Sequence, residues 1–196
     1  MILVALGSNL SGAWGAPSQI LNRAVLEMGK PPDTAILGLS GLYETAGVGR
    51  GRPGVFVNAV VSLECHCSAS ALLRRLKMIE HRAGPRSSRR WGPRTLDLDI
   101  LDYRGLIARW PQRGRLNEAA IRNQLVLPHP LLHERPFVLA PLDEVAPDWR
   151  HPVLRRTARQ LWRRKRDERS GRVLMRVGDM HYPMLDDPLA LMPKSA

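Results

Sequence analysis

The order of helix-like and strand-like segments over the first 103 residues constrains the fold of this chain more than any other feature of its sequence. Apolar residues follow a strand, helix, strand, strand, helix, strand order. This order predicts an α+β protein, a ferredoxin-like β-α-β-β-α-β sandwich with two helices on one sheet face and the other face free for a ligand. The expected strands are residues 2–6, 36–45, 55–64 and 96–103, and the expected helices are residues 17–28 and a segment that begins at Ser68 or Ser70 and ends near Gly84.

The remainder of the chain gives weaker patterns. Residues 125–147 contain short apolar pieces separated by prolines, a composition that favours edge strands and loops. Residues 155–169 are predicted to form a basic helix, and the segment beyond Gly171 shows no dependable period. We therefore expect one main domain over residues 1–152, with extra short strands, followed by a basic C-terminal helix and tail over residues 153–196.

The chain is strongly basic, with 30 lysines and arginines against 18 acidic residues and a formal net charge of +12. Such a surface attracts anions, which include nucleic acid, acidic lipid and phosphorylated small molecules. The excess charge gathers in residues 74–94 and 151–196. No apolar run reaches the roughly 18 residues of a membrane span, and the first residues do not resemble a secretory signal. We therefore expect a cytoplasmic protein without a membrane partner.

Two cysteines, Cys65 and Cys67, stand two positions apart at the end of an expected strand. At strand spacing their side chains are poorly placed to bond to each other, and His66 points to the opposite face. We therefore expect neither a disulfide nor a metal site at these positions.

The most informative segment for function runs from Arg90 to Ile100 and reads Arg-Trp-Gly-Pro-Arg-Thr-Leu-Asp-Leu-Asp-Ile. A strand would place the carboxylates of Asp97 and Asp99 on one face, about 7 Å apart. Carboxylate oxygens at this spacing suit one magnesium ion or a pair of them. The arginines just upstream would then surround a polyphosphate whose charge the metal only partly neutralises. This combination indicates magnesium–nucleotide chemistry.

The same segment resembles the signature of the 6-hydroxymethyl-7,8-dihydropterin pyrophosphokinase family, folate-pathway enzymes that move a pyrophosphoryl group from ATP to a pterin alcohol. The resemblance extends in the right order over roughly residues 1–152. It includes the segments Ala5-Leu6-Gly7-Ser8-Asn9-Leu10, Leu42-Tyr43-Glu44-Thr45, Phe56-Val57-Asn58-Ala59, Pro128-His129-Pro130 and Arg135-Pro136-Phe137-Val138-Leu139.

The resemblance implies a site for MgATP as co-substrate. The family's magnesium-binding carboxylates, which hold two ions, correspond to Asp97 and Asp99, and Arg86 and Arg94 would act with them on the phosphates. The loop after the second helix is one residue shorter than the Gly-Arg-x-Arg of some members, so Arg89 stands as the substitute for Arg86. The ATP contacts correspond to Glu80, Trp91, Arg94, Ile100, His129 and Arg135.

The resemblance also implies a pterin site. The family's substrate contacts correspond to Thr45, Val48, Phe56, Asn58 and Phe137. Two aromatic rings hold a flat heterocycle well, and an amide supplies both a donor and an acceptor to its edge. The backbone near Thr45 and Val48 would help to read the ring edge. The partners expected on this reading are the pterin alcohol and ATP, with no nucleic acid, and the chain is expected to be a monomer.

Two alternative functions fit parts of the pattern. An RNA-binding module would combine a ferredoxin-like sheet with a basic surface, although aromatic residues make up only 5% of the chain and paired aspartates repel phosphate without a metal. Another magnesium-dependent nucleotidyl or pyrophosphoryl transferase would use the same carboxylate pair. Dependence on magnesium separates the enzymes from the RNA-binding module, and an assay with the pterin alcohol separates the two enzymes.

Overall fold

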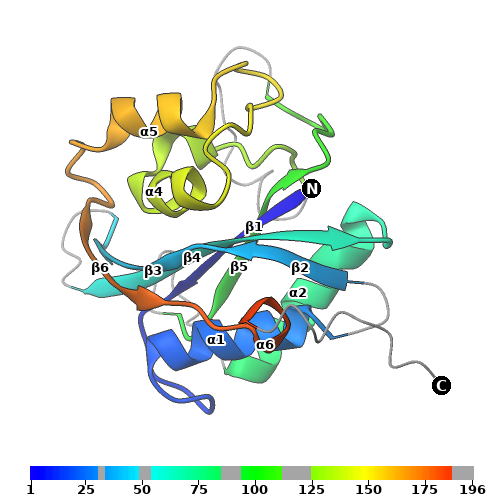
Figure 1. Cartoon of the computed structure of the whole chain (residues 1–196), viewed down its shortest axis with the longest axis vertical. Coiled ribbons are helices and arrows are strands. Elements are labelled where there is room, and N and C mark those ends of the chain that lie inside the picture. Colours follow the sequence, from blue (N-terminus) through cyan, green and yellow to red (C-terminus); the bar gives the residue numbers. More distant parts are fainter. Residues whose placement is uncertain (31–33, 49–53, 85–93, 112–124, 187–196) are drawn as a thin grey trace.

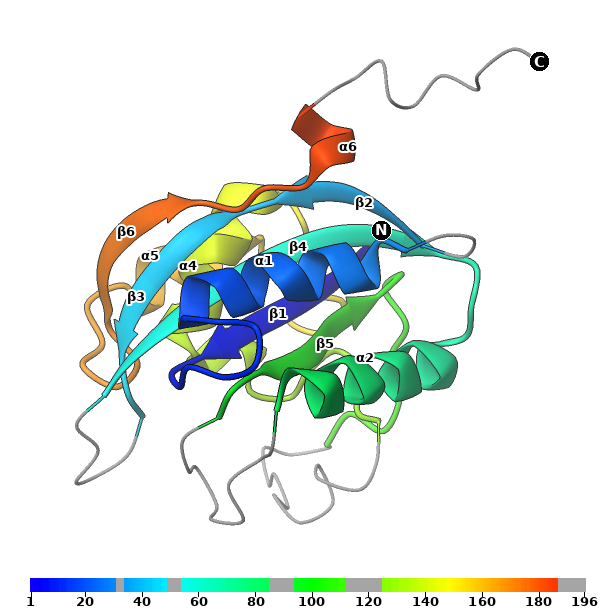
Figure 2. The same cartoon turned by 90° about the horizontal axis from the view of Figure 1, so that it is seen from below.

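The computed structural model describes residues 1–30, 34–48, 54–84, 94–111 and 125–186, and these residues build an antiparallel six-stranded sheet with helices on both faces (Figures 1 and 2). The strand order is β5-β1-β4-β3-β6, and β2 pairs with the other part of β4. The strands are β1 Ile2–Ser8, β2 Thr34–Leu39, β3 Gly41–Ala46, β4 Val55–Cys65, β5 Asp97–Tyr103 and β6 Val173–Asp179. The helices are α1 Pro17–Met28, α2 Ala69–Ala83, α4 Pro136–Val145, α5 Ala158–Lys165 and α6 Pro183–Asp186, with a 3-10 turn, η2, at Leu132–Glu134.

The predicted α+β class is confirmed, and so are the two helices expected in the first half of the chain. Pro17 occupies the first turn of α1, where its missing N–H costs no hydrogen bond. Ser68 caps α2, because its hydroxyl accepts a hydrogen bond from the N–H of Ala71 at 3.2 Å. The expected strand 36–45 is divided at Ser40 into β2 and β3, which pair with different parts of β4.

One face of the sheet, called the back face here, packs against α1 and α2 and carries the larger core. Leu98 and Ile100 of β5 point to this side and are almost fully buried, as the alternation in the sequence predicts. Apolar residues of both helices complete the core, among them Ile20, Leu21, Val25, Leu72, Leu76 and Ile79.

The opposite face, called the front face, is not left free, and the expectation of an open sheet face is wrong. Leu3, Val60 and Leu101 of the sheet form a second core with side chains of α4 and α5, and Figure 1 shows these helices on the side opposite to α1 and α2. This apolar packing covers only part of the front face. The part near the start of β5 carries the polar residues described below.

The expectation of edge strands and loops over residues 125–147 is also wrong, because residues 136–145 form α4. Pro136 stands in the first helical turn, and only Pro141 lies inside the helix. An internal proline removes one helix hydrogen bond. Burial of Val138, Leu139 and Leu142 in the second core stabilises the helix in spite of this loss.

The basic helix expected at residues 155–169 is confirmed in a shorter form as α5, and a capping box between Thr157 and Gln160 begins it. The segment beyond Gly171, which has no dependable period, forms β6 along the outer edge of β3 (Figure 2). Its pattern is obscured because most of its side chains are exposed on both faces.

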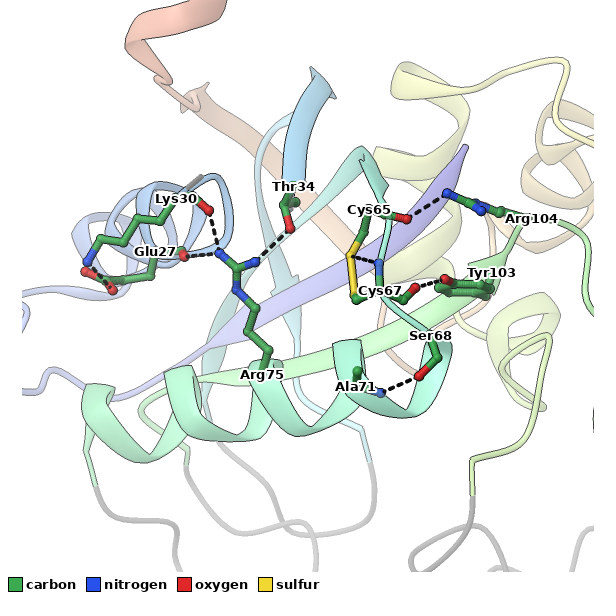
Figure 3. Close-up of a disulfide and its surroundings, with 10 residues drawn as sticks. All are labelled: Glu27, Lys30, Thr34, Cys65, Cys67, Ser68, Ala71, Arg75, Tyr103 and Arg104. Atoms are coloured by element: carbon green, nitrogen blue, oxygen red, sulfur yellow. Dashed lines mark hydrogen bonds and ion pairs between the residues drawn. A yellow bond between two sulfur atoms is a disulfide. The ribbon is translucent and has the colours of Figure 1, made fainter. Parts of the chain in front are cut away.

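The prediction that Cys65 and Cys67 do not bond to each other is wrong, because the structure joins them in a disulfide (Figure 3). Strand β4 ends at Cys65 and the chain bends immediately afterwards, so strand spacing does not extend to Cys67. The two Cα atoms lie 5.4 Å apart, within the range that a disulfide spans. Beside this bend, Arg75 of α2 donates to the Thr34 hydroxyl and to the carbonyl of Lys30, so it ties α2 to the segment before β2.

Among the described residues, no helix is both long and apolar enough to cross a membrane.

Candidate active site

Strand β5 places two carboxylates on the front face of the sheet, as the sequence predicts. Asp97 stands opposite Gly7 of β1, and Asp99 stands opposite Ala5. Their side chains are 28% and 35% exposed, so both carboxylates remain open to a ligand from solvent. Leu98, between them, is fully buried on the back face.

Basic side chains from three segments converge on the two carboxylates. A guanidinium nitrogen of Arg94, Nη1, lies 2.5 Å from Oδ2 of Asp97. Nε2 of His129 and Nη1 of Arg135 each lie 3.8 Å from Oδ2 of Asp99. The site therefore pairs anionic and cationic groups in alternation, an arrangement that suits a metal-bound polyphosphate.

These contacts shift the pKa values of the site. Burial raises the pKa of Asp99, but the charges of Arg135, Lys77 and Arg94, and that of His129 when acid protonates it, outweigh the effect of burial, and the net pKa is lowered. Burial, together with the charge of Arg135, lowers the pKa of His129 to about 4 in spite of Asp99. At neutral pH the imidazole is therefore uncharged, and the carboxylate of Asp99 is ionised.

Glu80 of α2 lies at the back of β5. It is 2% exposed, and its Oε1 accepts hydrogen bonds from the N–H of Leu98 and from Nζ of Lys77, each at 2.8 Å. Burial raises the pKa of this carboxyl group, although Lys77 and the N–H of Leu98 oppose the shift. Glu80 thus fixes the stretch of β5 between the two aspartates. A direct contact of Glu80 with ATP stays a prediction.

Ile100 also lies on the back face, where its side chain is 4% exposed and belongs to the larger core. A contact with ATP stays a prediction for this residue and would come from its main chain. Arg86, Arg89 and Trp91 lie outside the residues that the structure describes.

Asn9, in the opening segment that resembles the family, is a further residue of the candidate site, to which the sequence analysis assigns no role. Its Oδ1 accepts the N–H of Arg94 at 2.7 Å, and its own N–H donates to the carbonyl of Arg94 at 3.1 Å. This reciprocal pair fixes the main chain of Arg94 and so directs its guanidinium towards Asp97. Only the loop position after a buried strand hinted at this role.

The residues expected to bind the pterin continue the same front face across β4 and β3. Asn58 is 6% exposed, and its Nδ2 donates to Oγ1 of the buried Thr45 at 2.7 Å. This bond fixes the amide orientation. Phe56 alternates with Asn58 on β4 and stands opposite Thr45 of β3, so these side chains share the front face.

Gly7 separates the carboxylate end of the front face from the amide end. It pairs with Asp97 on one side and with Asn58 on the other. A Cβ atom at Gly7 would lie 2.9 Å from Oδ1 of Asn58, closer than side chains tolerate. The absence of a side chain keeps the surface bare between the two groups. The sequence shows this glycine as part of the opening motif, but it does not indicate this role.

Phe137 belongs to the layer that packs on the front face of the sheet. It stands in the first turn of α4 and is partly buried. The guanidinium carbon of Arg135 lies 5.6 Å from the centre of its ring, a cation–π distance. Through Arg135, which also approaches Asp99, the ring is therefore adjacent to the carboxylate pair.

Asp97 and Asp99 are carboxylates that could hold magnesium together with a bound nucleotide. Among the residues that the structure describes, no three His, Cys, Asp or Glu side chains come together as a metal-binding group. Magnesium in nucleotide enzymes is commonly held by one or two carboxylates, with substrate phosphates and water completing its octahedron. Asp97 and Asp99 supply that number.

Paired carboxylates, convergent arginines and an aromatic ring on one sheet face are typical of magnesium-dependent phosphoryl-transfer enzymes. The profile of the 7,8-dihydro-6-hydroxymethylpterin-pyrophosphokinase family matches residues 3–147. The chain belongs to this family. It transfers a pyrophosphoryl group from MgATP to 6-hydroxymethyl-7,8-dihydropterin, which yields AMP and the pterin diphosphate.

Two curated relatives agree with this membership. The 2-amino-4-hydroxy-6-hydroxymethyldihydropteridine pyrophosphokinase of Haemophilus influenzae is 36% identical over 145 residues, 74% of this chain and 81% of the relative. The protein of the same name from Synechocystis is 35% identical over 159 residues, which cover 81% of this chain and 73% of the relative.

Solved structures share the fold. A crystal structure described as wild-type HPPK-DHPS of Plasmodium falciparum with SDX-DHP aligns with a TM-score of 0.59 at 16% identity. The alignment covers 83% of this chain but only 44% of that chain. At this identity the likeness concerns the fold alone.

Proposed function

We propose that the front face between β5 and β3 is the site of pyrophosphoryl transfer, with ATP at its carboxylate end and the pterin at its amide end. One observation carries this assignment: Asp97, Gly7 and Asn58 stand opposite one another on three neighbouring strands. A substrate on the bare surface at Gly7 would reach the metal-binding carboxylates on one side and a fixed amide on the other.

At the nucleotide end, Asp97 and Asp99 would hold two magnesium ions between them, and Arg94 and Arg135 would contact the phosphates. Magnesium neutralises phosphate charge and polarises the phosphorus that is attacked. In the structure each carboxylate is paired with an arginine, Asp97 with Arg94 and Asp99 with Arg135. The arginines are therefore already directed towards the position that phosphate would take, which lowers the cost of ordering them.

At the pterin end, Asn58 would bind the polar edge of the heterocycle, and Phe56 and Phe137 would stack on its faces. The hydrogen bond from Asn58 to Thr45 uses one amide hydrogen, so the amide oxygen and the second hydrogen remain for the substrate. The backbone near Thr45 and Val48 would add contacts to the ring edge. Arg86, or Arg89 in its place, and Trp91 would complete the nucleotide side.

The reaction follows from this placement. The hydroxymethyl oxygen of the pterin attacks the β-phosphorus of ATP, the bond between that phosphorus and the oxygen bridging to the α-phosphorus breaks, and AMP leaves with that oxygen. The hydroxyl proton passes to solvent or to a phosphate oxygen. The chain contributes chiefly by positioning the two substrates and stabilising the charge that develops on the phosphates.

Release of AMP from MgATP, measured with and without 6-hydroxymethyl-7,8-dihydropterin, tests the activity. The expected result is AMP formation that requires both the pterin and magnesium, and ADP as the nucleotide product would contradict it. We also propose that the protein is cytoplasmic and monomeric, and light scattering at several protein concentrations tests the monomeric state.

The front face disfavours the alternative of an RNA-binding module. Such a module stacks bases on an open sheet face. In this chain α4 and α5 cover the middle of that face through Leu3, Val60 and Leu101.

A further inference from the structure

The turn that leads into β6 reaches the proposed pterin site. Gly171 stands in this turn, is buried and has a φ angle of +69°. A Cβ atom built at this position would lie 2.6 Å from Cδ1 of Phe137 and 3.3 Å from Cγ2 of Val48. The glycine therefore allows the main chain to pass directly against two residues that are expected to bind the pterin.

The main chain at Gly171 has little freedom to retreat from the ring. The carbonyl of the next residue, Arg172, accepts the N–H of Ala46 at 2.9 Å, and Val173 pairs with Thr45 of β3. Farther along β6, Arg176 donates to Oε1 of Glu144 at 3.0 Å. A side chain added at 171 would therefore displace the ring of Phe137 more readily than the backbone of β6.

The ring of Phe137 is held on other sides as well. Its neighbour Val138 is 3% exposed in the second core, and the guanidinium of Arg135 lies over the ring. The same guanidinium approaches Asp99. Displacement of the Phe137 ring would consequently change its position relative to the nucleotide end of the site.

We propose that Gly171 is a positioning residue for the pterin. Because it has no side chain, the ring of Phe137 can lie directly against the main chain, and Gly171 and Val48 together form one side of the proposed pterin site. This inference rests on the proposed location of the pterin site. It assigns part of the substrate specificity to a residue beyond the family match, which ends at residue 147.

The test compares Gly171→Ala with Gly105→Ala. Gly105 has nearly the same φ angle, +73°, but a Cβ atom there meets nothing within 4 Å. The two variants therefore share the backbone strain of alanine at positive φ and differ in the contact. Steady-state KM values for the pterin and for ATP, kcat and the thermal unfolding midpoint are measured for both.

We expect Gly171→Ala to raise the KM for the pterin roughly tenfold, the scale of one aromatic stacking contact, with little change in the KM for ATP. Gly105→Ala should leave both KM values unchanged. Combining Gly171→Ala with Phe137→Ala should add little to the effect of Phe137→Ala alone, because both changes act through the same ring.

The outcomes separate this inference from the proposed site. If Phe137→Ala leaves the pterin KM unchanged, the proposed site itself is wrong. If Phe137→Ala raises it but Gly171→Ala does no more than Gly105→Ala, the positioning role is overturned.

Should Gly171→Ala fold poorly, Val48→Ala leaves the backbone alone and opens space beside the ring. A rise in its pterin KM alone supports the inference, and wild-type values for both substrates overturn it.

Discussion

The two faces of β5 carry side chains with different roles, because alternate residues of the strand point to opposite sides of the sheet. On the back face, Leu98 and Ile100 are closed into a continuous apolar core by α1 and α2. On the front face, Asp97 and Asp99 remain about one-third exposed and are surrounded by cationic side chains. A strand of seven residues thus carries stability and chemistry on separate sides, so substitutions one position apart should affect different properties.

The largest expected effect lies on the front face. Asp97→Asn and Asp99→Asn keep the size of the side chain but remove the charge that would hold magnesium, and loss of that charge stabilisation should reduce turnover about a thousandfold or more. AMP release and thermal unfolding measure the two properties separately, and we expect the unfolding midpoint to change by only a few degrees. Asp148→Asn, at an exposed carboxylate outside the site, serves as the control. Near-normal activity in Asp97→Asn would exclude the metal role.

The neighbouring position on the back face should show the reverse behaviour. Leu98→Ala removes a fully buried side chain from the larger core and should lower the free energy of unfolding by about 2–5 kcal/mol. Turnover per folded molecule should stay within a few fold of the wild type. Leu37→Ala, at a side chain that is 51% exposed, should have little effect on either property. A large loss of turnover in folded Leu98→Ala would mean that the two faces are not independent.

Acid should lower the free energy of unfolding through protonation of His151. This imidazole is fully buried beside Trp110, Trp149 and His133, and burial lowers its pKa to about 4. The unfolded chain protonates first, near its ordinary pKa of about 6.5, so the free energy of unfolding should fall by up to about 3 kcal/mol between pH 6.5 and 4.

Denaturant unfolding at several pH values measures this loss. His151→Asn offers an amide oxygen in place of Nδ1, which accepts hydrogen bonds from the N–H groups of Val153 and Leu154, and it removes the titration. The variant should lose less stability in acid than the wild type. His66→Asn, at an exposed histidine, should follow the wild type, and equal pH dependence in all three proteins would exclude His151 as the cause.

The smallest expected effect comes from a comparison of two buried polar side chains, Asn58 and Ser40. Asn58→Ala should weaken pterin binding by roughly 1–3 kcal/mol, because it removes the amide that would pair with the ring edge, and it should leave ATP binding unchanged. Ser40→Ala removes a buried hydroxyl that accepts from the N–H of Val60, away from the proposed site. It should reduce stability without altering pterin binding. Titration calorimetry with each ligand measures both variants, and equal losses for pterin and ATP would indicate that Asn58 is structural.

Much of the back face and of β5 was predictable from the sequence, because strand alternation and helical periodicity report directly on burial. Asp97 and Asp99 were found because their spacing places both on one face. The helix α4 was not predictable by this reasoning, because Pro141 lies inside it and an internal proline argues against a helix unless the tertiary core is known. Likewise, β6 depends on hydrogen bonds to β3, and its exposed side chains leave no periodic pattern.

The contribution of individual glycines was the least predictable part of the site. A side chain at Gly7 or Gly171 would clash with neighbouring side chains, and those neighbours come from distant positions in the chain. Asn9 acts through the main chain of Arg94, which lies 85 positions away. Local sequence gives no measure of such approaches.

The position of β6 also bears on the solubility of the incomplete chain. Strand β3 lies inside the sheet only because β6, which follows much later in the sequence, pairs with its outer edge. Until then, the N–H and C=O groups along that edge of β3 are unpaired, and such an edge can recruit strands from other molecules. A nascent or proteolysed chain that ends before Val173 would therefore expose an aggregation-prone edge next to the proposed substrate site, even with most of both cores already formed.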